Sequence, residues 1–285
     1  MLQTAEKNIA VVCNPLAGAG RAIAFLEKLC RELTSRNKAY KVFTEKWPGN
    51  FDGFTDVFIV GGDGTLNYFV NLYPAIKLPL AVFNAGTGND FHWLLYGNKT
   101  FDEQMHIVLE AGPRPVDIGK CNRHYFINGV GIGFEGEVAR ALTGKKKRPG
   151  KASFLFCILQ KIFTYRSKNY SIRSAEWNET GKKLLVDIAN GRRAGGGFHI
   201  APESSADDGV FDVVVAGALN SFERLRYLPV IEKGKHLGLG FIHHHRTKKI
   251  SIESDELLQY HLDGEYGEAN KLEIEILPSQ LQFRY

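Results

Sequence analysis

The first part of the sequence alternates short apolar runs with stretches whose apolar residues recur every three or four positions. Apolar runs rich in β-branched and aromatic residues predict buried strands at residues 9–13, 40–43, 57–60 and 80–83. Helical spacing predicts helices at residues 21–33, 66–72 and 101–109, and Thr100 and Glu103 form the pattern of a capping box at the start of the last one. Strands that alternate with helices predict a parallel sheet covered on both faces.

The pattern changes from about residue 116 onward, where strand-like segments dominate. They lie at residues 116–118, 125–127, 170–172, 184–188, 211–216, 250–252 and 272–276. The last of these alternates apolar and polar residues strictly, as a half-exposed antiparallel strand does. Helical stretches at residues 151–165 and 221–235 interrupt this half. We therefore predict an α/β domain at residues 1–115 and a mostly-β domain at residues 116–285, whose last strand is a candidate to pack back on the first domain.

Composition narrows the class of protein. The 285 residues are 44% apolar and 24% charged, which is typical of a globular protein and argues against disorder. The longest apolar run, residues 154–159, is far shorter than the roughly 20 residues that a membrane-spanning helix needs. The first residues lack the pattern of a signal peptide. The four cysteines are scattered, which disfavours a disulfide framework or a thiolate zinc site and predicts a cytoplasmic protein.

The formal net charge of +5 is too small to indicate nucleic-acid binding, and we expect no nucleic-acid partner. It fits an anionic substrate or the anionic face of a membrane.

Three polar, glycine-rich turns follow three of the predicted strands. They are residues 14–20, 61–67 and 84–90. In open parallel sheets, ligands bind outside the carboxyl ends of the strands. Glycine amides and a following helix N-terminus together form a phosphate cradle. Thr65 and Thr87 are expected either to cap the following helices or to bind phosphate oxygens.

The familiar nucleotide motifs are absent. Residues 18–23 lack the third glycine of the Rossmann fingerprint, and no Gly-Lys-Ser/Thr sequence ends any of the loops. A hydride-transfer enzyme and a Walker-type ATPase are therefore disfavoured. Asp63 places a carboxylate inside a phosphate loop, where it would repel phosphates unless a divalent cation lay between them. This residue predicts a site for ATP and Mg²⁺.

The sequence Gly61-Gly62-Asp63-Gly64-Thr65 after an apolar strand resembles the signature of the diacylglycerol kinase, sphingosine kinase and NAD kinase superfamily. The resemblance extends along nearly the whole chain, in order through residues 14–18, 86–91, 116–119, 126–134, 195–202, 208–212 and 262–265. The segments after residue 116 favour the lipid kinase branch, of the soluble bacterial type, over the NAD kinases. The chain departs from the family pattern at Asn84-Ala85, where a proline is usual, and at His92-Trp93.

The resemblance implies a fold and a set of site residues. The fold would be an NAD kinase-like and diacylglycerol kinase-like α/β domain with a parallel sheet, followed by an antiparallel β-sandwich. Glu265 would be the general base and Asp63 the second catalytic residue. A structural Mg²⁺ would bind the Asp208 carboxylate and the carbonyls of Ser205 and Val210. The nucleotide contacts would be Asn14, Thr44, Gly61, Gly62, Asp63, Gly64, Thr65, Asn67, Gly86 and Thr87.

The function that these residues favour is an ATP- and Mg²⁺-dependent kinase of a lipid hydroxyl, with diacylglycerol, a sphingoid base or ceramide as acceptor. Two alternatives stay open. One is a kinase of a soluble acceptor such as NAD, and the other is a regulator that binds the nucleotide without transferring phosphate. The presence of both Asp63 and Glu265 argues against the regulator, because a sensor needs no base. The oligomeric state is open, and a homodimer is one option.

Two further stretches bear on membranes and metals. A basic cluster at residues 145–148 precedes the apolar residues 154–163, which suits a protein that visits the inner face of the membrane to reach its lipid. A buried helix explains the apolar stretch equally well, and we favour that interpretation for its apolar face. The three consecutive histidines at residues 243–245 cannot readily converge on one ion from a strand, so we do not expect a functional metal site there.

Overall fold

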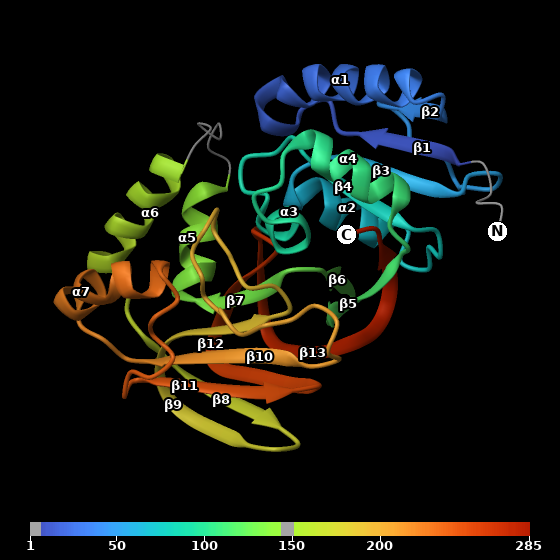
Figure 1. The fold of residues 1–285 in the computed structure, drawn as a ribbon. Helices are drawn as coiled ribbons and strands as arrows, with labels where there is room; N and C mark the ends of the chain where they lie inside the picture. Colours follow the sequence, from blue (N-terminus) through green and yellow to red (C-terminus); the bar gives the residue numbers. More distant parts are fainter. Residues whose placement is uncertain (1–6, 144–150) are drawn as a thin grey trace. The chain divides into compact units, whose positions relative to one another are not determined.

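The computed structural model describes residues 7–143 and 151–285, with the backbone alone at residues 151–153. The chain divides into two compact units (Figure 1). One contains Met1–Val116 and Gln280–Tyr285, and the other contains Asp117–Ser279. The basic cluster at residues 145–148 lies outside the described residues.

The first unit is built on a parallel sheet in the order β4-β3-β1-β2 (Figure 1). Its strands are β1 (Asn8–Cys13), β2 (Ala39–Phe43), β3 (Asp56–Gly61) and β4 (Leu80–Asn84), and all three neighbouring pairs run parallel. The strands β1, β3 and β4 are almost wholly buried, as strands covered on both faces must be. The helices between them are α1 (Arg21–Ser35), α2 (Asp63–Leu72), α3 (Asp90–Tyr96) and α4 (Phe101–Glu110), with a 3₁₀ turn at Ala17–Gly20.

Helix starts in this unit follow local chemistry, with one difference from expectation. The capping box of α4 is confirmed, because the Thr100 hydroxyl accepts the Glu103 N–H and the Glu103 carboxylate accepts the Thr100 N–H. Of the two roles expected for Thr65 and Thr87, capping of α2 and α3 is wrong, and binding of phosphate oxygens stays a prediction. The N-cap residue of α2 is Gly62 and that of α3 is Asn89.

Residues 280–285 complete the first unit. Phe283 pairs in parallel with Leu80 of β4, and its ring lies 5.7 Å from that of Phe91. Arg284 forms an ion pair with Asp56, whose side chain is only 1% exposed. Since a buried carboxylate is stable only when it is paired, these last residues neutralise a charge that β3 carries into the core.

The second unit is mostly antiparallel sheet (Figure 1). Strand β7 joins β9 to β12, and β8 also joins β9 to β12, so the long strands β9 and β12 are linked twice. They enclose a core that includes Phe126, Ile132, Tyr170, Val213 and Ile252. The strands are β5 (Arg114–Cys121), which begins in the first unit, β6 (His124–Phe126), β7 (Gly129–Gly133), β8 (Lys168–Ser174), β9 (Asn178–Ala189), β10 (Phe211–Gly217), β11 (Ile242–Thr247), β12 (Lys249–Leu262) and β13 (Glu265–Phe283), which ends in the first unit.

Three helices lie in the described part of the second unit. They are α5 (Phe134–Leu142), α6 (Lys151–Thr164) and α7 (Ser221–Glu232). A separate apolar cluster joins them, formed by Val138, Cys157, Ile158 and Ile162 together with the loop residues Phe198 and Ile200.

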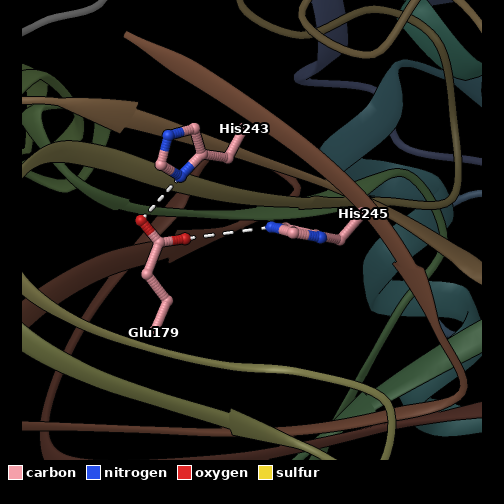
Figure 2. A group of neighbouring side chains, drawn as sticks. All are labelled: Glu179, His243 and His245. Atoms are coloured by element: carbon pink, nitrogen blue, oxygen red, sulfur yellow. Dashed lines mark hydrogen bonds and ion pairs between the residues drawn. The ribbon is translucent and has the colours of Figure 1, made fainter.

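Helices α3 and α5 and strand β11 were not predicted from the sequence. Helix α3 begins directly after a glycine-rich turn and α5 directly after the glycine-rich strand β7, and both settings hide the start of a helical pattern. Strand β11 consists largely of polar residues, so it lacks an apolar signal. Within β11, His244 Nε2 donates to the Asp212 carboxylate, whereas His243 and His245 point toward Glu179 (Figure 2). This alternation is what a strand imposes on consecutive side chains.

Candidate functional site

The loops that follow β1 and β3 are tied together by Asn14. This residue begins the loop after β1, and its side-chain NH₂ donates to the Thr65 hydroxyl over 3.3 Å. Its side-chain oxygen accepts the N–H of Leu16 over 3.0 Å, which shapes the loop itself. Because β1 and β3 run parallel and adjacent, their carboxyl ends bring the two loops to one edge of the sheet.

The loops that follow β3 and β4 touch through glycine backbone. A Cβ atom added to Gly62 would lie 2.8 Å from the Cα of Gly86, a contact that side chains do not make. The Ala85 N–H donates to the Gly61 carbonyl over 2.8 Å. Glycine is therefore required at residues 62 and 86 by close approach of the two loops.

Asp63 holds the third loop in place. Its carboxylate accepts the backbone N–H groups of Asp90 over 2.9 Å and of Phe91 over 3.2 Å. These amides are at the start of α3, so Asp63 caps that helix from a different segment of the chain. Sequence analysis missed this role, because the contact joins residues that are far apart in the sequence.

Arg21 is a further residue that the sequence analysis did not single out. Its guanidinium donates to the carbonyl of Gly18 over 2.9 Å and to that of Gly86 over 3.0 Å. It therefore joins the loop after β1 to the loop after β4 and adds a positive charge at this edge of the sheet. Its position as the first residue of a helix after a glycine-rich turn was the available signal.

The predicted nucleotide-binding residues thus divide into two groups. The structure brings Asn14, Gly61, Gly62, Asp63, Thr65 and Gly86 into one connected set of loops. Gly64 and Thr87 are exposed on those loops, Asn67 lies further along α2, and Thr44 follows β2, which pairs with β1. An edge with glycine backbone, a helix N-terminus at α2 and an arginine can bind an anion of the size of a phosphate chain.

Glu265 of the second unit lies at the end of a tight hairpin. Leu262 pairs with Glu265, and the two residues between them, Asp263 and Gly264, have φ values of 48° and 88°. Positive φ at both positions is the signature of a type I′ turn, for which Asp-Gly is a preferred sequence. Glu265 is exposed immediately after this turn.

The Asp263 side chain fixes the hairpin to the neighbouring segment. Its carboxylate accepts three backbone N–H groups, from Ile127, Asn128 and Gly129, over 2.8 to 2.9 Å. The exposed Glu265 is therefore carried by a turn that is rigidly attached to the start of β7.

A cluster of buried ionisable groups lies behind the same hairpin, and the sequence analysis missed it. Glu135 of α5 and His261 of β12 lie 3.8 Å apart between Oε2 and Nε2, and each side chain is 14% exposed. Asp187 of β9 is buried, and Gly131 pairs with both Asp187 and His261. A side chain at residue 131 would overlap Glu135 and His261, so its glycine makes room for the cluster. Glu135 follows the last glycine of β7 by two residues, and nothing in the local sequence marks it as buried.

Burial controls the ionisation of this cluster. It raises the pKa of Glu135 from 4.5 to about 7. It also raises the pKa of Asp187, and the nearby charge of Glu135 raises it further. The pKa of His261 falls from 6.5 to about 4 for the same reason, so its imidazole is neutral near pH 7. The Gly264 N–H donates to His261 Nδ1 over 3.2 Å, which leaves the Nε2 hydrogen of the neutral ring directed toward Glu135.

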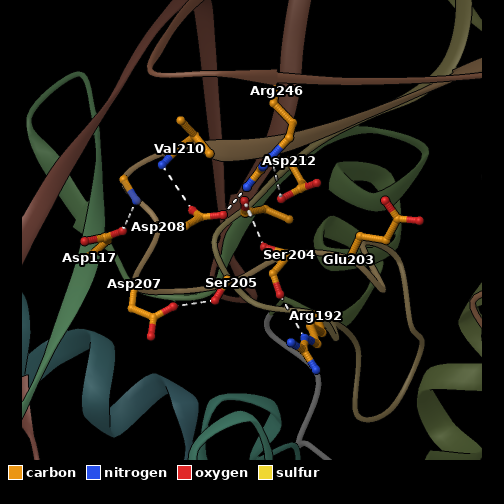
Figure 3. Close-up of polar contacts among 12 residues, drawn as sticks. Asp117, Arg192, Glu203, Ser204, Ser205, Asp207, Asp208, Val210, Asp212 and Arg246 are labelled. Atoms are coloured by element: carbon orange, nitrogen blue, oxygen red, sulfur yellow. Dashed lines mark hydrogen bonds and ion pairs between the residues drawn. The ribbon is translucent and has the colours of Figure 1, made fainter.

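The loop before β10 contains the predicted magnesium ligands (Figure 3). The Asp208 carboxylate accepts the Val210 N–H over 3.2 Å and forms an ion pair with Arg246. The Ser205 hydroxyl donates to Asp207. An arginine therefore already neutralises Asp208, and a Mg²⁺ ion there would compete with it. The magnesium site at Asp208, Ser205 and Val210 stays a prediction.

Asp117 stabilises the same loop. Its carboxylate accepts the N–H of Gly209 over 2.7 Å (Figure 3). It also accepts the N–H of Ser279 over 2.7 Å. The loop is therefore held by backbone donors that contact a buried carboxylate.

Helix α6 is apolar on two sides. Cys157, Ile158 and Ile162 are buried among helices, whereas Phe156 and Phe163 are 69% and 65% exposed. The expectation that the apolar residues of this helix are buried holds for the first group only. Among the described helices, none combines the length and the apolar character needed to cross a bilayer.

Comparison with known proteins assigns both halves of the chain. Residues 8–121 match the diacylglycerol kinase catalytic domain, and residues 128–284 match the YegS C-terminal NAD kinase beta sandwich-like domain. A "Probable lipid kinase YegS-like" protein of Shewanella frigidimarina is 30% identical over 81% of this chain and 77% of its own length. A "Diacylglycerol kinase" of Bacillus subtilis is 30% identical over 75% of this chain and 72% of its own length.

A solved structure has the same fold. The crystal structure of a Bacillus anthracis protein that is described as a diacylglycerol kinase superposes with a TM-score of 0.79 at 25% identity. The match covers 98% of this chain and 95% of that one.

Proposed function

This chain belongs to the diacylglycerol kinase and YegS-like family of lipid kinases, and from that premise we propose that it transfers the γ-phosphoryl group of ATP to a hydroxyl group of diacylglycerol or a related membrane lipid. The observation that carries the proposal is the joining of three loops at one edge of the first unit by Asn14, Arg21 and Asp63. The joined loops place glycine-rich backbone beside the N-terminus of α2, an arrangement that suits a phosphate chain.

The loops provide binding and orientation for the nucleotide. Gly64 and Thr87 present exposed backbone beside the N-terminus of α2, where the helix dipole favours negative charge. Arg21 adds a full positive charge. Phosphoryl transfer depends mainly on positioning and on neutralising charge over the phosphate oxygens, and these groups do both.

Magnesium is compatible with Asp63. The carboxylate accepts the backbone N–H groups of Asp90 and Phe91, and carboxylate oxygens are ligands that Mg²⁺ prefers. When bound, Mg²⁺ would supply further neutralisation of the triphosphate. The two amides hold the carboxylate still, so it would meet the ion without reorganisation.

Glu265 is the proposed general base. It would accept the proton of the lipid hydroxyl as the hydroxyl oxygen forms a bond to the γ-phosphorus and the bond to ADP breaks. Support for this role comes from its exposure on a hairpin that the Asp263 carboxylate fixes. Burial disfavours the charged forms of Glu135 and His261 behind the hairpin, which suits the approach of a largely apolar acceptor.

The lipid would be taken from a membrane surface. The exposed rings of Phe156 and Phe163 lie seven residues apart on α6, which places them on one face of the helix. Phe222 of α7, a helix that packs against α6, is 79% exposed. Exposed aromatic side chains on helices are suited to insertion at the boundary between headgroups and acyl chains. We place the protein at the inner face of the membrane as a peripheral protein.

Labelled ATP, Mg²⁺ and a panel of detergent-dispersed lipids test the central proposal. The panel contains diacylglycerol, a sphingoid base and ceramide, and mass spectrometry identifies the product. A phosphorylated lipid is expected. Phosphorylation of NAD alone would instead establish the soluble-acceptor alternative, and nucleotide binding without any product would establish the regulator.

The variant Glu265→Gln tests whether Glu265 acts as the general base, because it removes the carboxylate and keeps the shape of the side chain. It is expected to bind ATP nearly as the unchanged chain does and to lose about 10² or more in turnover. The matched control is Glu268→Gln, an exposed glutamate three residues further along β13. Unchanged turnover of Glu265→Gln would remove this residue from the mechanism.

Vesicle co-sedimentation tests the membrane surface. The double variant Phe156→Ser/Phe163→Ser is expected to bind anionic phosphatidylglycerol vesicles at least 10-fold more weakly, because each buried ring contributes about 2 kcal/mol. Leu257→Ser is the control, since Leu257 of β12 is also exposed, at 43%. Equal binding of the double variant and the unchanged chain would contradict the role of α6.

A further inference from the structure

Three metal-binding side chains of the second unit converge at a point that the kinase site does not use. Glu179 of β9 and His243 and His245 of β11 each offer one ligand atom, and these atoms all lie within 4.8 Å of one another (Figure 2). We propose that Glu179, His243 and His245 form a binding site for a divalent transition-metal ion, with Zn²⁺ as its occupant.

The sequence analysis expected that three consecutive histidines cannot all converge on one ion. It did not consider that two of them can face one ion together with a ligand from another strand. Residues two apart on a strand share a face, so His243 and His245 point the same way while His244 turns toward Asp212. The third ligand comes from a different strand and was invisible in the sequence pattern.

The distances suit a metal ion after small side-chain rotations. His243 Nδ1 lies 2.8 Å from Glu179 Oε1, and His245 Nε2 lies 3.8 Å from Glu179 Oε2. Tetrahedral Zn²⁺ binds nitrogen and oxygen at about 2.0–2.2 Å, which separates neighbouring ligand atoms by about 3.3 Å. The two measured distances lie on either side of that value.

The ligands are held by a rigid setting. The His245 ring stacks on Trp177, with ring centroids 4.0 Å apart and planes 16° from parallel. Trp177 belongs to the β8–β9 hairpin, which the Ser174 N–H closes by donating to the Trp177 carbonyl over 2.9 Å. The Thr247 hydroxyl donates to Glu176 over 2.7 Å and ties the same hairpin to β11. A site that is already assembled needs little ordering when the ion binds.

The charges of the site favour a cation on one side of the carboxylate. Glu179 Oε2 is buried and accepts no hydrogen bond from the described residues, so it has lone pairs available. Lys183 and His243 contact the other carboxylate oxygen, Oε1.

The identity of the donors selects the metal. Two imidazoles and a carboxylate suit Zn²⁺ and similar ions, whereas Mg²⁺ and Ca²⁺ prefer oxygen ligands throughout. Three protein ligands leave a fourth position for water. The ion would link the first residues of β9 to β11 and would stabilise the second unit without taking part in phosphoryl transfer.

Zinc titration of the untagged full-length chain by calorimetry, in buffer without chelators, tests the site. The chain is expected to bind one Zn²⁺ ion with its highest affinity. The variants His243→Ala/His245→Ala and Glu179→Gln are each expected to weaken that binding at least 10-fold. The controls His106→Ala and His124→Ala change exposed histidines elsewhere and are expected to bind as tightly as the unchanged chain. Equal affinity of the double-histidine variant, or no binding by the unchanged chain, would overturn the proposal.

A second variant and a spectroscopic probe distinguish loss of the metal site from misfolding of the variant. The Lys183 ammonium contacts Glu179 and competes with the ion, so Lys183→Met is expected to bind Zn²⁺ more tightly. A merely structural role of the cluster would not produce a gain. Co²⁺ in place of Zn²⁺ is expected to give visible absorption bands in the unchanged chain and not in the double-histidine variant. Weaker Zn²⁺ binding by Lys183→Met, or identical Co²⁺ spectra, would contradict the assignment.

Discussion

The variant Glu135→Gln tests the buried cluster behind the Glu265 hairpin. The side chain keeps its shape in this variant but no longer titrates. Burial of Glu135 raises its pKa from 4.5 to about 7, so the folded state holds a proton that the unfolded state has already lost. The free energy of unfolding therefore falls as the pH rises from about 4.5 to about 7, and it changes little above that range.

The size of the effect follows from the two pKa values. Their difference corresponds to at most about 3 kcal/mol. His261 acts with the opposite sign, because its pKa is lowered from 6.5 to about 4 and stability is lost as the pH falls through that range. The unchanged chain therefore shows a small net slope, and the comparison with Glu135→Gln removes the contribution of this carboxyl group together with its effect on the pKa of Asp187. The variant is expected to gain up to about 3 kcal/mol relative to the unchanged chain between pH 5 and pH 8.

Urea unfolding at several pH values measures the difference. The chain has three tryptophans, and only Trp177 lies in the second unit. A background with Trp47→Phe and Trp93→Phe makes the fluorescence of Trp177 report on the unit that contains Glu135. Asp255→Asn, at an exposed residue of β12, is the control. A stability difference between Glu135→Gln and its background that is the same at pH 5 and pH 8 would refute the reasoning.

Three other predictions concern the loops. Gly86→Ala is expected to reduce nucleotide binding at least 10-fold, since a Cβ atom there would overlap the backbone of Gly62. Calorimetry with ATP measures the affinity. An unchanged affinity would show that the two loops can separate without loss of nucleotide binding. Asp63→Ala is expected to lower the free energy of unfolding by about 1–2 kcal/mol through loss of the cap on α3 and also to weaken ATP binding in the presence of Mg²⁺. A fully stable Asp63→Ala chain in thermal unfolding would contradict the capping role. Arg246→Met is expected to make the thermal midpoint rise more steeply with MgCl₂, because Asp208 loses its guanidinium partner, and an unchanged response would argue against Mg²⁺ at that loop.

The sequence predicted those features that depend on neighbouring residues. The predictions of strands β1, β3 and β4 and of the capping box of α4 were correct, because apolar runs and short-range hydrogen bonds involve only residues that are close in sequence. The glycine loops at one edge of the sheet followed from the rule that parallel strands end on the same side. Family resemblance then supplied the kinase activity, which the comparisons support.

The features that the sequence did not reveal depend on contacts between distant segments. Asp63 was interpreted through its charge, and its bonds to the start of α3 appear only in three dimensions. Glu135 gave no signal of burial, because its surroundings come from β7, β9 and β12. Glu179 and the two histidines of β11 are separated by more than sixty residues, and only the folded chain brings them together.

Residues 280–285 constrain the order in which the two units of the chain can be completed during synthesis. They add the Phe283 pairing to β4 and the Arg284 partner of Asp56, so the first unit is assembled from segments that lie on both sides of the second unit in the sequence. A ribosome must therefore synthesise the whole second unit before the first can be completed. Until then Asp56 lacks its arginine and the Phe91 ring lacks its aromatic neighbour. The nascent protein thus cannot complete the unit to which we assign the nucleotide site before the unit that carries Glu265 has also been made.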